Sequence, residues 1–213
     1  MPFARTLRGL LRVRERLMPN EFAKGEPLES VLDRYLMVVE STSESDTITS
    51  ILLLDGATLR DGAAPRLPRA YRNAINGLPI GPTAGSCGTA AFHGHPIYVS
   101  DIANDPLWSD YQELALSHGL RACWSTPIRN SEDRLIGTFA VYHQRPRSPT
   151  KEEVEAIGTI TEHVARAIMF YRGSHYETDT PQMSEPERAR PKLRLVSDSD
   201  AEAALGDPGE QDL

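Results

Sequence analysis

Two cysteines are the residues of this 213-residue chain best suited to covalent chemistry. Cys87 lies in the glycine-rich segment Gly85–Ala90, and Cys123 lies in an apolar segment further along. A thiolate attacks electrophilic sulfur, and a second thiol can resolve the product, so the pair is compatible with thiol redox chemistry. Free cysteines also occur often as small buried residues. Both interpretations stay open, as does a redox-sensing role for Cys87.

The other titratable residues form no catalytic or metal-binding pattern. The histidines include no pair at the spacing typical of a metal site: His93, His95, His118, His143, His163 and His175. Asp101 and Asp105 are suited to capping helices and pinning loops, or to hydrogen bonding with a ligand, and capping is the favoured interpretation. No nucleophile with an adjacent base and no phosphate-binding glycine motif is found. The sequence therefore predicts no catalytic residue, no metal and no cofactor.

Hydrophobic periodicity and turn signals predict the elements that position these residues. Thr150 and Glu153 have the spacing of a capping box, and so do Ser109 and Gln112. Neighbouring strands joined by tight turns favour an antiparallel sheet with helices, an α+β domain. The expected helices are 27–41, 67–76, 89–92, 105–119 and 150–172, the expected strands are 48–55, 58–60, 96–101, 120–128 and 135–143, and 81–88 is expected to be a turn.

Two of the later strands carry features that bear on a site. In strand 135–143, Gly137 predicts a bulge or a close approach of backbone. In strand 120–128, alternation places Trp124 and Thr126 on one face and Cys123 and Ser125 on the other. Alternation alone does not show which of these faces lies toward a cavity.

The stretch from Gly81 to Ile128 resembles the second half of a GAF domain, a small-molecule sensor module of bacterial signalling proteins. The resemblance is carried by Gly85–Ala90, Pro96–Asp101, Asp105–Trp108 and Gly119–Ile128, is continued by Gly137–Tyr142, and covers roughly residues 27–172. It implies an α+β fold with a central antiparallel sheet of about five to six strands. The terminal helices would pack on one face. Loops and short helices would close a ligand pocket on the other.

The same resemblance implies a non-enzymatic sensory domain that binds a small molecule of unknown identity. Aromatic side chains in a pocket offer apolar area with a polar tip, although core packing accounts for the same residues. The residues expected to bind the ligand are Cys87, Phe92, Asp101, Trp108, Tyr111, Trp124 and Thr126.

Signalling partners are also implied by the resemblance. It implies homodimers through the first and last helices, and a signalling protein that receives the output in trans. A short a/d seam along the last helix is compatible with a helical partner. The seam consists of Val154, Ile157, Thr161, Val164, Ile168 and Tyr171.

Two alternative functions remain. The segment Gly85–Ala90 is similar to that of free methionine-(R)-sulfoxide reductases, which are enzymes on the GAF fold, and Cys87 matches one of their cysteines. The position of their nucleophilic cysteine falls in Tyr111–His118, which contains no cysteine here. The other alternative is a dimeric interaction module with an empty pocket. A bilin-binding GAF domain is not favoured, because Trp124 and Gly88 follow the two cysteines where a histidine is usual.

Charge divides the chain into three parts. Residues 1–26 form a basic arm, expected to be a solvated helix or a disordered segment, with a membrane-surface or nucleic-acid contact as the alternative. Residues 27–172 form the sensor domain, and the chain outside the acidic tail is nearly neutral, which predicts no general nucleic-acid face. Residues 173–213 hold ten acidic and four basic residues and are expected to be a disordered tail, with 190–196 as a candidate docking motif. The sequence predicts no membrane span and a cytoplasmic location, since two cysteines are too few for a disulfide framework.

Overall fold

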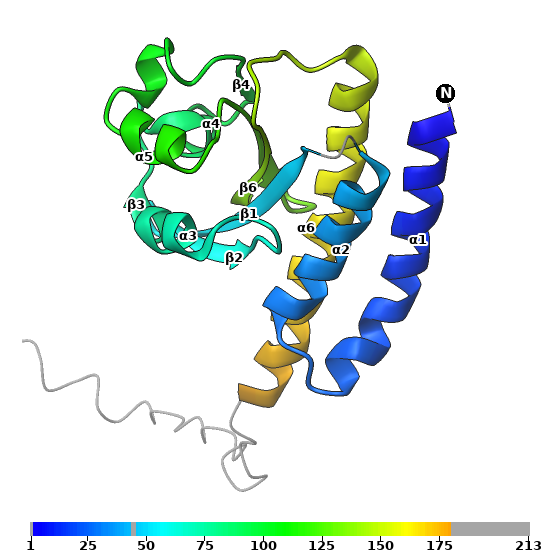
Figure 1. Ribbon diagram of the computed structural model, residues 1–213. Coiled ribbons are helices and arrows are strands. Elements are labelled where there is room, and N and C mark those ends of the chain that lie inside the picture. Colours follow the sequence, from blue (N-terminus) through cyan, green and yellow to red (C-terminus); the bar gives the residue numbers. More distant parts are fainter. Residues whose placement is uncertain (1, 44–45, 180–213) are drawn as a thin grey trace, which may run out of the picture. The chain divides into compact units, whose positions relative to one another are not determined.

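The computed structural model describes residues 2–43 and 46–179, and only the backbone of residues 2–4 and 175–179 (Figure 1). The strands and the helices that pack on them belong to one compact unit, Met1–Glu177. The helices are α1 (Pro2–Ala23), α2 (Leu28–Thr42), α3 (Arg69–Ile75), α4 (Gly85–His93), the 3-10 helix η1 (Pro106–Trp108), α5 (Gln112–Ser117) and α6 (Lys151–Asp179). The strands are β1 (Ile48–Asp55), β2 (Thr58–Ala63), β3 (Leu78–Pro79), β4 (Ile97–Val99), β5 (Ala122–Arg129) and β6 (Leu135–His143).

The six strands form one antiparallel sheet in the order β3-β2-β1-β6-β5-β4. The central strands β1 and β6 are paired from Ile48 with Tyr142 to Leu53 with Gly137. At Gly137 a Cβ atom would lie 2.4 Å from the carbonyl oxygen of Leu52, so only glycine permits this approach. The predicted close backbone approach at Gly137 is thus confirmed, as is the predicted α+β fold.

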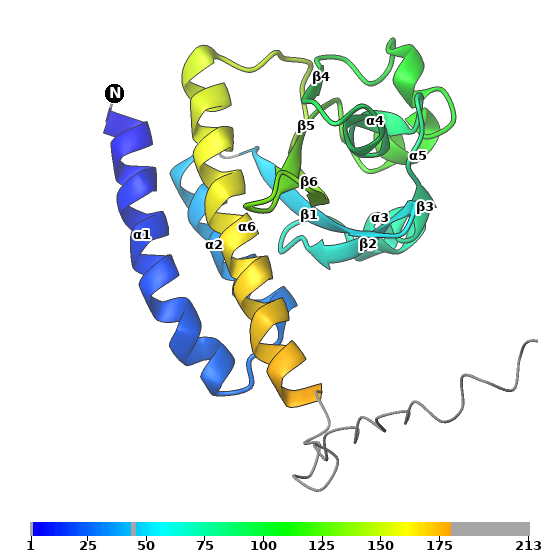
Figure 2. The same ribbon diagram turned by 180° about the vertical axis from the view of Figure 1, so that it is seen from behind.

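Alternate residues of the sheet face two different layers. Ile51, Trp124 and Phe139 are buried together with side chains of α1, α2 and α6. Their sequence neighbours Leu52 and Cys123, together with Tyr142, are buried with side chains of α3, η1 and α5. Figures 1 and 2 show α2 and α6 on one side of the sheet and α3, α4 and α5 on the other. We call the side of the sheet that packs against α2 and α6 the helix face, and the opposite side, covered by α3, α4 and α5, the pocket face.

Helix α1 corrects the expectation of a fully solvated arm. It lies beside α2 and α6 on the side away from the sheet (Figures 1 and 2). Its buried apolar positions recur at helical spacing, and they join the helix-face core: Leu7, Leu11, Met18 and Phe22. Glu15 of α1 pairs with Arg166 of α6 at 2.5 Å. The many arginines of this segment occupy the remaining faces, which is why composition alone concealed the buried stripe.

Several predicted boundaries shift. The predicted turn 81–88 already contains the first turn of α4, and β2 continues past Gly62 to Ala63. The Thr150–Glu153 capping box is confirmed, with backbone-to-side-chain distances of 2.7 and 3.3 Å. The one predicted at Ser109 and Gln112 is wrong, because the Ser109 hydroxyl bonds to the Pro106 carbonyl and the Gln112 amide to the 102–103 backbone.

Helix α6 runs to Asp179, past the predicted end at residue 172. The candidate docking motif 190–196 and the rest of the acidic tail lie outside the described residues. None of the helices in the described part of the chain has both the length and the apolar character that crossing a membrane requires.

Candidate functional site

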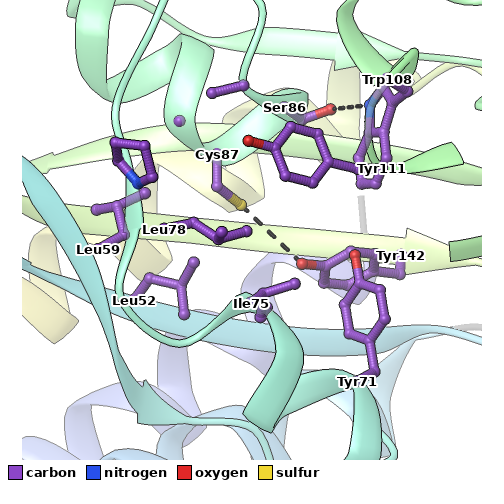
Figure 3. A pocket seen from close by; sticks show the side chains of 14 residues that line it. Leu52, Leu59, Tyr71, Ile75, Leu78, Ser86, Cys87, Trp108, Tyr111 and Tyr142 are labelled. Carbon is purple, nitrogen blue, oxygen red and sulfur yellow. Dashed lines mark hydrogen bonds between the residues drawn. The ribbon is translucent and has the colours of Figure 1, made fainter. Parts of the chain in front are cut away.

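A pocket with about 420 Å³ of empty space, part of it open to solvent, lies on the pocket face between the sheet and the short helices (Figure 3). Its walls are apolar and aromatic, with a few hydroxyl and thiol groups. No charged side chain is found among the described residues that line it, which are Leu52, Leu59, Tyr71, Ile75, Leu78, Pro79, Ala84, Gly85, Ser86, Cys87, Gly88, Trp108, Tyr111 and Tyr142.

The first turn of α4 is fixed between the sheet and η1. Ser86 donates a hydrogen bond to the carbonyl of Cys123 on β5 at 2.9 Å, and it accepts one from the indole Nε1 of Trp108 at 3.1 Å. Gly85 adopts a φ of +60°, which favours glycine, and its missing side chain faces the Trp108 ring. Asp105 caps η1 through the backbone N–H of Leu107 at 2.9 Å. The glycine-rich segment therefore seats Cys87 above β5, with its side chain turned into the cavity (Figure 3).

Three buried hydroxyls lie on the pocket face of the sheet beneath α4. Ser50 of β1 and Ser125 of β5 flank Ala140 of β6 in register, and Thr138 lies two residues before Ala140. These hydroxyls are fully or almost fully buried, and none makes a hydrogen bond of ordinary geometry with another described residue. Buried hydroxyls without a partner are uncommon because desolvation is costly. They mark a polar patch below an apolar cavity.

The groups around this patch change the pKa of Cys87. Its Sγ lies 4.0 Å from the Tyr142 hydroxyl (Figure 3). The Cys123 thiol is the largest influence that lowers the pKa of Cys87, and the hydroxyls of Ser125, Thr138 and Tyr142 lower it further. These groups outweigh burial and bring the pKa of Cys87 to about 7. Burial, and then contact with Cys87, raises the pKa of Cys123. Of the two thiols, Cys87 therefore ionises at the lower pH, and Cys123 stays protonated.

Two tyrosines close the side of the cavity next to β6. The rings of Tyr71 and Tyr142 meet edge to face with centroids 6.1 Å apart. Burial raises the pKa of both phenols well above the ordinary value, and the nearby cysteines raise both further. Both tyrosines therefore stay neutral and present hydroxyl groups to the cavity.

The structure brings together three of the seven predicted ligand-binding residues. Cys87, Trp108 and Tyr111 all line the cavity, and they come from α4, η1 and the residue that precedes α5. Their convergence matches the expectation that short helices cover this face. Whether they bind a ligand remains a prediction.

The other four predicted residues lie elsewhere. Trp124 is in the helix-face core, where its Nε1 donates to the Arg147 carbonyl at 3.1 Å, and Thr126 shares its strand face. Phe92 is 52% exposed on α4. Asp101 accepts hydrogen bonds from the Ala103 backbone and the Asn104 side chain, at 3.2 and 2.6 Å, which is the loop-pinning role. Trp124 was misplaced because strand alternation does not identify the inner face.

Sequence reasoning missed most of the apolar lining and Tyr142. Alternation along β6 places Tyr142 on the same face as Thr138 and Ala140. Tyr142 could therefore have been predicted to line the cavity if the cavity-facing side of β6 had been known. Tyr71 and Ile75 belong to the buried stripe of the third helix, but nothing in the sequence separates packing against a core from lining a cavity. No group of three or more metal-binding side chains is found among the described residues.

Comparisons with known proteins agree with this architecture. A GAF domain family model matches residues 25–169. The methyl sulfide methyltransferase-associated sensor of Methanosarcina acetivorans is 36% identical over 152 residues, which are 70% of this chain but only 14% of that protein.

Solved structures are similar over most of the chain. A domain of a putative two-component sensor histidine kinase from Sinorhizobium meliloti 1021 is 25% identical with a TM-score of 0.59, covering 72% of this chain and 99% of that one. The free methionine-R-sulfoxide reductase of Neisseria meningitidis, solved with its substrate, is 18% identical with a TM-score of 0.61, covering 80% and 93%. The second likeness shows the fold alone. Because the family model matches more than half of the chain, the chain belongs to the GAF domain family.

Proposed function

We propose that this chain is a non-enzymatic sensor that binds an uncharged, largely apolar small molecule in the cavity above Cys87. The observation that carries the proposal is the lining itself, which joins aromatic and aliphatic walls to a few hydroxyl and thiol groups. The relatives named as sensors support the same role.

The chemistry of the lining selects against charged ligands. Burying an ionised group without a charged partner is costly, and the described lining offers no such partner. Free amino acids and nucleotides carry charges that this cavity would leave unpaired. A neutral compound with one hydrogen-bonding group fits better, since Tyr71, Tyr142 and Cys87 can each pair with such a group.

Strand alternation offers a route from the cavity to the helices. Tyr142 faces the cavity, while its neighbours Val141 and His143 face α2 and α6. On β5, Cys123 lies on the pocket face and Trp124 on the helix face. A ligand that prefers one arrangement of the sheet will favour the matching arrangement of the helices by the same free energy.

The output surface is proposed to be a dimer interface on α1. The predicted seam on α6 is occupied within the chain, because Ile157, Val164 and Ile168 are buried in the helix-face core. The outer side of α1 instead exposes Leu10, Val13 and Leu17 at 40%, 54% and 45%. Their i, i+3, i+7 spacing is that of a short helical seam. Sedimentation of the full chain should give a dimer, and Val13→Glu with Leu17→Glu should give a folded monomer.

Thermal-shift measurements test the ligand proposal. A panel of small compounds should contain matched pairs of neutral and charged forms, such as an aromatic alcohol and the corresponding acid. At a hundred times Kd, a bound ligand stabilises the fold by about 2.7 kcal/mol, which is readily measured. Stabilisation by neutral members only is expected, and it should disappear in Leu78→Trp, which fills the cavity. If only charged members stabilise the protein, the proposal is wrong.

The cavity also bears on the two alternative functions. A sulfoxide reductase for free methionine has to bind a zwitterion, and the described lining has no charged side chain for either end. Turnover with a thiol reductant, compared between wild type and Cys87→Ser, tests that enzyme directly. If the chain were an interaction module whose pocket binds no ligand, Trp108 and Trp124 would be expected to fill the cavity. Trp124 instead lies on the helix face, and Trp108 forms a wall of the cavity.

A further inference from the structure

We propose that Cys87 and Cys123 form a redox-active dithiol, in which Cys87 reacts with a small hydroperoxide that enters the cavity and Cys123 closes a disulfide with it. This is a modification site, and it does not depend on the identity of the ligand proposed above. It rests on the position of Cys87, on the environment of its sulfur, and on the placement of Cys123.

The position of Cys87 gives a small oxidant access to its sulfur. It lines the cavity and is partly exposed, whereas Cys123 is 0% exposed. Cys87 is the third residue of α4, where unpaired backbone N–H groups favour a thiolate. An oxidant that enters the cavity therefore meets Cys87 first.

The surroundings of the sulfur stabilise a thiolate and its oxidised product. Tyr142 lies 4.0 Å from Sγ, and the buried hydroxyls of Ser125 and Thr138 have no other hydrogen-bond partner among the described residues. Both belong to strands against which α4, the helix of Cys87, packs, and both lower the pKa of Cys87. These hydroxyls can donate hydrogen bonds to the thiolate sulfur of Cys87, and after oxidation to the oxygen of its sulfenic acid.

Cys123 is placed to resolve that product. Its backbone carbonyl accepts the hydrogen bond of Ser86, the residue before Cys87, at 2.9 Å. Cys123 is also the direct cross-strand partner of Tyr142, whose hydroxyl contacts Cys87. Helix α4, which carries Cys87, packs against β5, which carries Cys123, and each thiol shifts the pKa of the other.

The chemistry balances in two steps. The Cys87 thiolate attacks one oxygen of the hydroperoxide, the O–O bond breaks, and the departing alkoxide or hydroxide takes a proton, leaving Cys87 as a sulfenic acid. The Cys123 sulfur then attacks Sγ of Cys87, the S–S bond forms, and the S–O bond breaks. The hydroxide leaves as water with the proton of the Cys123 thiol. The peroxide accepts two electrons, and the two thiols supply them.

The expected rate follows from two opposing effects. At pH 7, a thiol with a pKa of about 7 is about fiftyfold more ionised than one at 9.0, but its thiolate is about tenfold less nucleophilic. Cys87 should therefore react about fivefold faster than an unperturbed cysteine. Its reactivity should rise with a midpoint near pH 7.

The test uses the full chain, reduced and then treated with hydrogen peroxide, followed by peptide mapping. Wild type should yield a Cys87–Cys123 disulfide within one chain. Cys123→Ser should stop at a sulfenic acid on Cys87, which a cyclic dione captures, and Cys87→Ser should leave Cys123 unoxidised. Thr138→Val should raise the pH midpoint for alkylation of Cys87, while Thr126→Val on the helix face should not.

Three results would overturn the proposal. They are Cys87 oxidised to a sulfinic acid beside a free Cys123 in wild type, a disulfide between two chains instead of within one, and no reaction of Cys87 above that of an unperturbed thiol. If Cys123→Ser does not fold, the wild-type peptide map decides the question alone. Because the readout is sulfur chemistry, failure here leaves the ligand proposal standing, and failure of the thermal-shift screen leaves this one standing.

Discussion

The two faces of the central sheet are built from alternating residues of the same strands, yet they carry different kinds of side chain. The helix face is filled by large apolar side chains such as Trp124, Phe139 and Ile128, which pack against α2 and α6. The pocket face carries small polar groups at equivalent positions, including Cys123, Ser125 and Thr138, and above them lies a cavity. Both faces bury an apolar core, and the pocket face adds a cavity lined by hydroxyl and thiol groups.

Two buried threonines illustrate the contrast, although unpaired polar atoms also occur on the helix face, such as Glu40 Oε2 and Thr126 Oγ1. On the helix face, the Thr49 hydroxyl and backbone N–H both bond to Glu40 Oε1, at 2.8 and 2.7 Å. On the pocket face, the Thr138 hydroxyl has no hydrogen-bond partner of ordinary geometry among the described residues. Paired polar groups secure a fold, and unpaired ones are available to a ligand or a thiolate.

The largest effect is expected from truncation on the helix face. Phe139 is 0% exposed, and Phe139→Ala should lower the free energy of unfolding by about 3–5 kcal/mol. Leu78→Ala at the partly buried margin of the cavity should cost clearly less, because part of its surroundings is already empty. Urea denaturation of both variants makes the comparison. Equal losses would mean that the cavity wall is as tightly packed as the helix face.

The next effect compares two threonines in neighbouring strands. Thr49→Val leaves the buried Glu40 carboxylate without one donor and should cost about 1–3 kcal/mol. Thr138→Val removes a hydroxyl that has no ordinary partner and should change stability by less than about 0.5 kcal/mol. Chemical denaturation at pH 7 distinguishes them. A loss at Thr138 as large as that at Thr49 would show that its hydroxyl is paired in solution.

A pH effect is expected from the helix face. His143 is 1% exposed with its ring 4.5 Å from that of Trp124, and burial, then Arg147, lowers its pKa below 6.5, against the opposing effect of Asp46. Because the unfolded chain binds the proton first, the stability due to neutral His143 is complete above about pH 6.5. It declines as the pH falls toward the lower folded-state pKa, by at most about 1.4 kcal/mol per pH unit.

The measurement is the free energy of unfolding between pH 7.5 and about 5. His143→Gln should reduce its slope. The pKa of His163 on α6 is lowered for the same main reason, so His163→Gln should reduce the slope independently. A slope that neither substitution changes would assign the acid sensitivity to other groups.

The smallest effect is expected at Phe92. This residue was predicted to bind the ligand, but it is 52% exposed and does not line the cavity. Phe92→Ala should change stability by less than about 0.5 kcal/mol and leave the thermal shift of a bound neutral compound unaltered. A loss of that shift would restore Phe92 to the site.

The sequence was a good guide to the fold and a partial guide to the site. The 3.6-residue period located α2 and α3, because each has one buried side, and a nearly continuous apolar run located β1, which is covered on both faces. The buried stripe of α1 was hidden among arginines. Trp124 was assigned to the pocket because the alternation of β5 is symmetrical, and only the packed helices break that symmetry. The hydroxyl patch depends on the register of β1, β5 and β6, which a single strand cannot reveal.

The two tryptophans of the chain offer the most direct test of the central claim, since one lies on each face. Trp108 lines the cavity and bonds to Ser86, and Trp124 lies on the helix face and bonds to Arg147. The indole N–H signals should be followed by NMR during titration with a neutral compound that stabilises the protein. The account predicts a large shift for Trp108 and a smaller, transmitted one for Trp124. A shift confined to Trp124, or saturation with neither signal moving, would contradict it.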